Sequence, residues 1–357
     1  MEGLKTLEGI KTLVERMDLS YNASTAIMKE IMSGNAMEAQ ISAFLTAFRM
    51  KGETIEEITA FAAVMKEFCT KIYPEITGRL VDTCGTGGDQ IKTFNISTTS
   101  AFVTAGAGIS IAKHGNRSVT SKCGSADVLE QLGLNFELEP IDVKHHIENI
   151  GIGFMFAPKF HPAMKHAIGP RKKIGIRTAF NILGPLTNPA NADAQVLGVY
   201  SAEWVEPLAH VLKKLHCKEA MVVHGIDGLD EISIIGKTLI AWLQAGEISR
   251  IKVSPKDYGF KIAKPNEISG TTPEESAELT FKILNNILTE NDPKRNIVLL
   301  NAAAGIVVGG LSDDLSSGIE LAIESLESGA AYNKLKQLIK VSNGDLSRLE
   351  ELERKYA

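Results

Sequence analysis

Cysteine and excess positive charge are both scarce in this sequence of 357 residues. Its four cysteines, Cys69, Cys84, Cys123 and Cys217, form no CxxC pair and no zinc-like spacing. Scattered cysteines fit a reducing cytosol, where thiols serve as small apolar side chains. The net charge of -5 and the lack of a long basic run argue against sequence-independent binding of nucleic acid, which depends on Lys and Arg contacts to phosphate.

Long apolar runs are missing as well. Charged residues recur every few positions in the first twenty residues, so there is no apolar region of a signal peptide. No stretch approaches the length of a membrane span, and there is no internal repeat or low-complexity tract. We therefore expect a soluble cytoplasmic protein whose 44% hydrophobic content supplies a large core.

The first seventy residues predict a small helical bundle. Two segments repeat the i, i+3, i+4, i+7 spacing of an apolar helix face. Their apolar positions are Ile41, Phe44, Leu45 and Phe48 in one segment and Ile58, Phe61, Ala62 and Met65 in the other. Thr54 and Glu57 have the spacing of a capping box, and Gly34 and Gly52 lie where helices would end.

The character of the sequence changes near Pro74. Short apolar runs at 79–82, 109–112, 195–200 and 220–224 then alternate with helix-compatible segments such as 98–107 and 128–133. This alternation predicts an α/β domain with a mostly parallel sheet. Functional loops of such domains cluster at the carboxyl ends of the strands, and Gly85, Lys113 and His224 all follow predicted strands. Residues 155–189 are less regular and predict a connecting segment with a helix around 162–168.

A glycine-rich turn, GTGGD at residues 85–89, follows the first predicted strand. It lacks the lysine of a P-loop and the last glycine of a GxGxxG fingerprint, so neither a nucleoside triphosphatase nor a dinucleotide fold is indicated. A tight structural turn and an anion cradle are both compatible with it. Asp89 beside such a cradle would repel an anion unless it binds a hydroxyl or a metal-bound water.

Two more segments are suited to phosphate. Asn95, Ser97 and Thr98 open a predicted helix, where free N–H groups and the helix dipole favour an anion, although ordinary capping needs one such residue. The run KHGNR at 113–117 ends a predicted strand and leads into a loop with hydroxyls and Lys122. Three such segments in order indicate a site for a heavily phosphorylated small molecule.

Asp230 and Glu231 follow the glycine-containing loop at 224–229. Adjacent carboxylates are often solvated acids in a turn. Next to a diphosphate site they suit Mg²⁺, which takes one or two carboxylates together with substrate phosphates and waters.

Together these motifs resemble the anthranilate phosphoribosyltransferase family of tryptophan biosynthesis. The matching segments are GTGGD at 85–89, NIST at 95–98, KHGNR at 113–117, KCGSAD at 122–127, HPAM at 161–164, GIRTAFNILGPLTNP at 175–189 and the acids at 230–231. They occur in the family's order over most of the chain. The resemblance implies a helical domain from residues 1–73, completed by about 156–189, and an α/β domain from 74–155 and 190–357. It also implies a homodimer that forms through the helical domain.

The resemblance further implies the substrates and their sites. 5-Phosphoribosyl 1-diphosphate would be bound by Gly85, Gly88, Asp89, Thr93, Asn95, Ile96, Ser97, Thr98, Lys113, Ser121 and Ser125. Anthranilate would be bound by Gly85, Asn116 and Arg171, with His114 and His161 nearby. Ser97, Asp230 and Glu231 would serve magnesium ions, two per site, which arrive with the diphosphate. Lys113, Asp230 and Glu231 are the residues we expect to carry catalysis.

The implied reaction is the second step of tryptophan synthesis from chorismate, in which the anthranilate amine displaces pyrophosphate from ribose C1. Two alternatives stay open from the sequence. A pyrimidine nucleoside phosphorylase shares the general fold but fits the glycine turn and paired acids less well. A nucleic-acid-binding relative without catalysis should be basic, whereas this chain is acidic.

Overall fold

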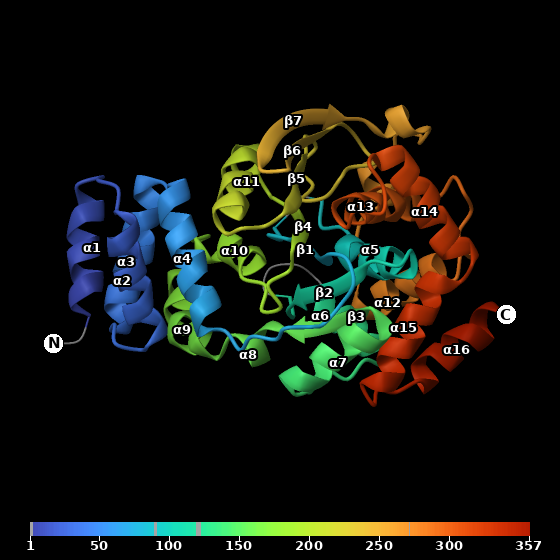
Figure 1. The fold of residues 1–357 in the computed structure, drawn as a ribbon, viewed down its shortest axis with the longest axis horizontal. Helices are drawn as coiled ribbons and strands as arrows, with labels where there is room; N and C mark the ends of the chain where they lie inside the picture. Colours follow the sequence, from blue (N-terminus) through green and yellow to red (C-terminus); the bar gives the residue numbers. More distant parts are fainter. Residues whose placement is uncertain (1–2, 89–90, 119–122, 271) are drawn as a thin grey trace.

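The computed structural model describes residues 3–88, 91–118, 123–270 and 272–357. Figure 1 shows a helical bundle at one end, a sheet in the middle, and a group of C-terminal helices at the other end. None of the described helices is long and apolar enough to cross a membrane.

The bundle is formed by the first four helices, as the sequence predicted. They are α1 (Leu4–Val14), α2 (Tyr21–Met32), α3 (Glu38–Lys51) and α4 (Ile55–Phe68). All eight apolar residues of the two predicted helix faces are at most 4% exposed. The capping box at Thr54 and Glu57 is confirmed, and Gly34 and Gly52 take positive φ angles of 75° and 93° just after helices α2 and α3.

The described residues also form one seven-stranded sheet in the order β3-β2-β1-β4-β5-β6-β7. The first five strands in this order are parallel, and β6 and β7 continue the sheet in antiparallel pairing. The mostly parallel sheet is therefore confirmed. The strands are β1 (Leu80–Gly85), β2 (Ser110–Gly115), β3 (Ile152–Phe156), β4 (Ala194–Gly198), β5 (Glu219–Gly225), β6 (Thr238–Gln244) and β7 (Glu247–Val253).

Both faces of the central strands are buried, which is why they read as nearly continuous apolar runs. On β4 and β5, Val196, Met221 and Val223 belong to the large core beneath the C-terminal helices. Their neighbours Leu197 and Val222 belong instead to the core that is shared with the bundle. The period-2 alternation of strand side chains thus joins the sheet to two separate cores.

The helices of the α/β part are α5 (Ile96–Gly106), α6 (Ser125–Gln131), α7 (Pro140–Ile150), α11 (Val205–Lys214), α12 (Pro273–Leu284), α13 (Pro293–Val308), α14 (Leu315–Glu327), α15 (Ala330–Val341) and α16 (Ser347–Tyr356). Helix α13 is buried almost throughout and packs against α5, α14 and the sheet. Helix α11 packs on β5 and β6 and also contacts α4 of the bundle.

The segment after β3 differs in detail from the sequence prediction. Strand β3 occupies residues 152–156, where the sequence analysis placed the start of the irregular segment. Short helices α8 (Ala157–Phe160) and α10 (Phe180–Leu183) flank α9 (Lys165–Ile174). The predicted helix at 162–168 begins as a separate 3₁₀ turn at Pro162 and continues as α9 to Ile174. Helix α9 packs against α3 and α2, and α10 packs against α4 (Figure 1).

Candidate active site

Four of the parallel strands, β1, β2, β4 and β5, end on a glycine, and these ends lie along one edge of the sheet. Gly85 of β1 pairs in register with Gly198 of β4. A Cβ atom on Gly85 would lie 2.6 Å from Oδ2 of Asp230, and one on Gly198 would lie 1.6 Å from the Asp230 carbonyl oxygen. The two glycines therefore leave the space that Asp230 occupies. Gly198 was not identified from the sequence, where a glycine at the end of a strand gives no distinct signal.

The glycine turn after β1 is arranged around the same carboxylate. Gly87 and Gly88 have φ angles of 67° and 83°, which side chains other than glycine rarely adopt. The Gly87 N–H donates a hydrogen bond to Asp230 Oδ2 at 2.8 Å. A carboxylate thus accepts a hydrogen bond from one of the backbone N–H groups that we predicted to bind phosphate.

Glu231 is bound in the same way at the start of α5. The Ser97 N–H donates to Glu231 Oε1 at 3.1 Å. Asp230 and Glu231 are each only 8% exposed. The two acids are therefore held by two of the predicted anion-binding segments, the glycine turn and the helix N-terminus.

The remaining residues of the NIST segment have different environments. Ile96 and Thr98 are both 1% exposed, so their side chains face the core and their backbone is the part that remains for a ligand. The Asn95 amide nitrogen donates to the Cys123 carbonyl at 3.3 Å and does not cap α5. Within the described residues, the buried Asn95 Oδ1 has no hydrogen-bond partner. Such an oxygen is costly unless a ligand donor satisfies it.

Lys113 lies inside β2, not after it, and is 3% exposed. Its Nζ donates to the Thr83 carbonyl at 2.6 Å. Burial lowers the pKa of Lys113, while Asp82, Cys84 and Glu231 act to raise it. The ammonium group thus lies in the electrostatic field of the site acids.

Asp82 is a site neighbour that the sequence analysis did not select, because it lies within an apolar strand. It is fully buried, and burial raises its pKa above the usual carboxyl value despite the opposing effect of Lys113. Asn188 Nδ2 donates to Asp82 Oδ2 at 2.8 Å and also to the Ala112 carbonyl. This buried network links β1, β2 and the end of the 175–189 motif.

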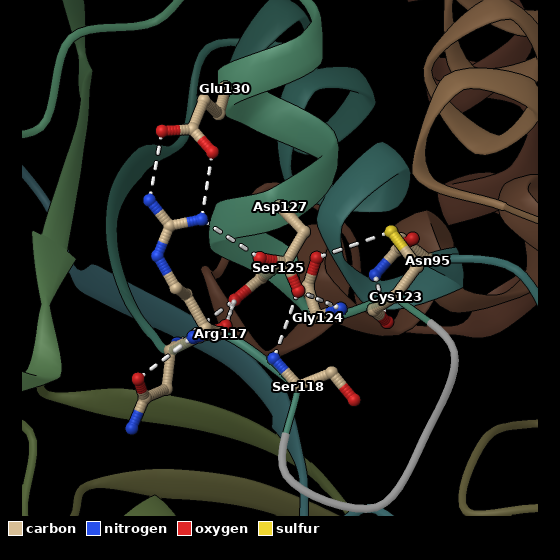
Figure 2. A network of polar contacts seen from close by, with 9 residues as sticks. Asn95, Arg117, Ser118, Cys123, Gly124, Ser125, Asp127 and Glu130 are labelled. Atoms are coloured by element: carbon tan, nitrogen blue, oxygen red, sulfur yellow. Dashed lines mark hydrogen bonds and ion pairs between the residues drawn. The ribbon is translucent and has the colours of Figure 1, made fainter.

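The loop after β2 is fastened to the start of α6 (Figure 2). Ser125 Oγ and the backbone of Asn116 exchange hydrogen bonds at 3.1 and 3.2 Å. Asp127 Oδ2 accepts from the N–H groups of Ser118 and Gly124, so one carboxylate oxygen ties together two points of the chain that flank residues 119–122. Arg117 reaches Asp127 and Glu130 on α6. Ser125 therefore acts on the Asn116 backbone in this structure.

Three predicted donor residues remain, Asp89, Ser121 and Thr93. Asp89 and Ser121 lie outside the described residues. Thr93 forms an isolated β-bridge with Ser269, which brings the segment before α5 next to the chain that leads to α12.

The rings of His114 and His161 are in contact, with centroids 4.9 Å apart and planes tilted by 43°. Burial lowers the pKa of His161 to about 4 and that of His114 well below its usual value, so both rings are neutral at pH 7. Hydrogen bonds to the carbonyls of Gly184 and Thr187 oppose these shifts. Within the described residues, Nε2 of each histidine is buried without a partner. The structure therefore brings these two candidates together.

Arg171 reaches the same segment from α9. Its guanidinium lies 5.0 Å from the centre of the Phe180 ring, and burial lowers its pKa. No carboxylate lies within ion-pair distance of Arg171 among the described residues, whereas the exposed Lys173 pairs with Glu38. A half-buried guanidinium on an aromatic face is suited to a planar carboxylate.

Asp230 and Glu231 are also the candidate ligands for magnesium. No group of three or more His, Cys, Asp and Glu suited to a metal occurs in the described part of the chain. Asp230 and Glu231 alone do not make a complete cage. They fit Mg²⁺ that takes its other ligands from substrate oxygens and water.

The chain was then compared with known proteins. Residues 77–332 match the family model for the glycosyl transferase family α/β domain, and residues 7–69 match that for the helical bundle domain of the same family. An anthranilate phosphoribosyltransferase of Acetivibrio thermocellus is 49% identical over 340 residues, covering 95% of this chain and 97% of the relative. One of Thioalkalivibrio sulfidiphilus is 50% identical over 332 residues, covering 93% and 97%.

Solved structures give the same result. The crystal structure of anthranilate phosphoribosyltransferase from Thermus thermophilus matches with a TM-score of 0.87 and 37% identity, covering 94% of this chain and 99% of that one. The enzyme from Saccharomyces cerevisiae, in complex with PRPP and Mg, also has a TM-score of 0.87, with 29% identity and coverage of 95% and 98%. The resemblance stated from the motifs is confirmed, and none of the relatives described here supports the two alternatives.

Proposed function

The chain belongs to the anthranilate phosphoribosyltransferase family, and on that premise we propose that it joins the phosphoribosyl group of 5-phosphoribosyl 1-diphosphate to anthranilate. The products are N-(5-phosphoribosyl)anthranilate and pyrophosphate, which makes this the second step of tryptophan synthesis from chorismate. The observation that carries the proposal is the pair Asp230 and Glu231, held by N–H groups of the glycine turn and of α5.

The donor binds at this edge of the sheet. Backbone N–H groups that already bind carboxylates at Gly87 and Ser97 are suited to phosphate oxygens. The unpartnered Asn95 Oδ1 can accept from a ribose hydroxyl. We assign the donor to Gly85, Gly88, Asp89, Thr93, Asn95, Ile96, Ser97, Thr98, Lys113, Ser121 and Ser125.

Magnesium accompanies the diphosphate, and we propose two ions per site. Asp230, Glu231 and the Ser97 hydroxyl would hold them, partly through water. When bound, magnesium neutralises the charge that develops on the leaving pyrophosphate. Lys113 contributes a buried positive charge on the same side of the site.

The acceptor is oriented by Arg171, with Asn116 and Gly85 beside it. Arg171 pairs with the anthranilate carboxylate and so aims the amine at ribose C1. Two neutral histidines, His114 and His161, line this side and add no second positive charge to compete for the carboxylate.

The bond changes are simple. The lone pair of the amine forms the N–C1 bond, the C1–O bond breaks, and its electrons leave with pyrophosphate, with inversion at C1. The new ammonium then loses a proton to water. Because an aromatic amine is already a free base near neutral pH, we assign no residue as a general base.

Segment 156–189 completes the helical domain in this proposal, because α9 and α10 pack on the bundle. We also propose a homodimer in the cytoplasm. Leu7, Val14 and Met17 lie on or just after α1 with 41%, 65% and 54% exposure, an unusual apolar surface for a helix at the outer end of the bundle. Light scattering of wild type and of L7Q/V14Q should report two chains and one chain, respectively. A monomeric wild type would refute the dimer.

The direct test follows the fluorescence of anthranilate in the presence of the donor. We expect loss of the signal that requires protein, donor and Mg²⁺ together, with release of pyrophosphate in equal amount. No loss with folded protein would reject anthranilate as the acceptor. Phosphorolysis of thymidine or uridine without metal, measured in parallel, would instead support a nucleoside phosphorylase.

A further inference from the structure

Arg177 lies between α9 and α10, in the segment that packs on the bundle, yet its side chain reaches the glycine turn of the α/β part. Its Nη2 donates to the Gly88 carbonyl oxygen at 2.8 Å. The same guanidinium lies 4.5 Å from the centre of the Tyr200 ring. One side chain therefore contacts both the turn and an aromatic face.

Tyr200 is itself fixed to that turn. Its N–H donates to Thr86 Oγ1 at 3.1 Å, and its hydroxyl accepts from Trp204 Nε1 at 3.1 Å. The Thr86 N–H in turn donates to the Gly198 carbonyl at the end of β4. Tyr200 thus forms a rigid platform that holds one part of the turn while Arg177 holds another.

Two side chains of the helical bundle lie beside Arg177 and Tyr200. Arg49 and Glu53, at and just after the end of α3, line one small cleft with Arg177, Tyr200 and Trp204. Glu53 is largely buried, and burial raises its pKa. No carboxylate lies within ion-pair distance of Arg177 in the described residues, so the Gly88 carbonyl and the ring are the contacts that fix its guanidinium.

The physical consequence concerns the direction of one peptide group. Gly87 and Gly88 both have positive φ and little intrinsic preference, so the turn needs an external restraint. A carbonyl oxygen that swings toward a diphosphate repels it, whereas a carbonyl held by a charged donor leaves the N–H groups to face the anion. A planar guanidinium can donate in its plane and stack on a ring at once, which an ammonium cannot do.

We propose that Arg177 is a positioning residue, which clamps the Gly88 carbonyl against the Tyr200 platform and so holds the glycine turn in its diphosphate-binding form. This rests on the proposed function for the identity of the donor. Arg177 lies in the segment that packs on the helical bundle, and it would affect donor binding through the glycine turn.

The test uses R177A, R177K, Y200L and the double variant R177A/Y200L, with K252A on the exposed strand β7 as the control. Wild-type transfer to anthranilate is measured first, which tests the proposed function separately. Binding of magnesium pyrophosphate is measured by calorimetry in every variant, so the clamp is tested even if anthranilate is not the acceptor. Hydrogen exchange of residues 85–88 and thermal unfolding are recorded for the same samples.

We expect R177A to weaken pyrophosphate binding and raise the donor KM about tenfold, the usual effect of losing a hydrogen bond from a charged donor. The anthranilate KM should stay unchanged. Y200L should reproduce the loss, R177K should not restore binding, and the double variant should be no worse than R177A. Exchange at 85–88 should rise with no change in Tm.

Three outcomes would overturn the proposal. Unchanged pyrophosphate binding in R177A would show that the clamp is not needed. Wild-type binding in Y200L, or effects of the two substitutions that multiply in the double variant, would show that Arg177 contacts the ligand independently of the platform. Full rescue by R177K would show that charge alone matters.

Discussion

The two sides of the candidate site differ in the chemical groups that line them. On the side that we assign to the donor, backbone N–H groups at strand and helix ends bind two carboxylates that are only 8% exposed. On the side that we assign to the acceptor, a half-buried arginine and two neutral histidines in contact lie along one segment at 180–187. The donor side thus contains two carboxylates and the buried Lys113, whereas Arg171 is the charged group of the acceptor side.

This difference matches what each side must recognise. A diphosphate carries several charges and needs many donors together with cations, which the strand ends provide at fixed positions. A singly charged aromatic acid needs one directional partner and a surface of neutral rings. The donor side is supplied mainly by the α/β part, and most of the acceptor side by the segment that packs on the bundle. Each side can therefore be altered separately.

The largest effect should come from removing the charge of the donor side. D230N with E231Q keeps amide oxygens that can accept from Gly87 and Ser97, so the fold should survive. We expect kcat/KM to fall by about 10³-fold or more, because several kcal/mol of charge stabilisation is lost. Activity assays at saturating magnesium check this, with the exposed E247Q as control. Wild-type turnover of the double variant would remove both acids from the mechanism.

A smaller and more selective effect should come from the acceptor side. R171A is expected to raise the anthranilate KM by about 10- to 100-fold, because a bidentate carboxylate contact is lost. The donor KM should change little. Steady-state kinetics with each substrate varied in turn separates the two, and K172A, at the adjacent exposed position, is the control. Equal changes in both KM values would contradict a division of the site into two sides.

The smallest effect should be a pH dependence of stability that comes from the acceptor side. The folded pKa of His161 is about 4, below the 6.5 of an exposed histidine, so between these values the unfolded chain binds more protons. The free energy of unfolding should therefore show no effect of His161 above pH 6.5, and it should decrease as the pH falls from 6.5 toward 4. Chemical denaturation at several pH values checks this, and H161Q should give a shallower decrease. The same slope in both proteins would show that His161 does not titrate on unfolding.

The sequence predicted the elements whose signal is local. Helical spacing identified the faces at Phe44 and Phe61, and glycine and hydroxyl residues marked the turn and the start of α5. It did not predict β6 and β7. Strand β7 is a half-exposed edge strand with alternating apolar and polar residues, whereas β6 contains a continuous apolar run at 239–243 that the sequence analysis did not select. Strand β3 was missed because its five residues run directly into α8.

The sequence predicted which residues form the candidate site more completely than it predicted the contacts between them. Asp230 and Glu231 were selected from the sequence, but their binding to Gly87 and Ser97 depends on pairs more than 130 positions apart. Asp82 and Gly198 were missed, because their roles arise from what faces them in the fold. Arg177 was within a recognised motif, yet its contact with Gly88 depends on how two parts of the molecule meet.

The hydrogen bond between Gly87 and Asp230 has a consequence for selectivity among anions. A carboxylate tethered on the same chain is present at the turn at a high effective concentration, which free anions in solution do not reach. Chloride or inorganic phosphate must therefore compete with an occupant that never diffuses away. An anion that brings its own cations gives the carboxylate a better partner and frees the N–H group at the same time. We therefore expect the glycine turn to bind a metal-bound diphosphate in preference to simple anions such as chloride.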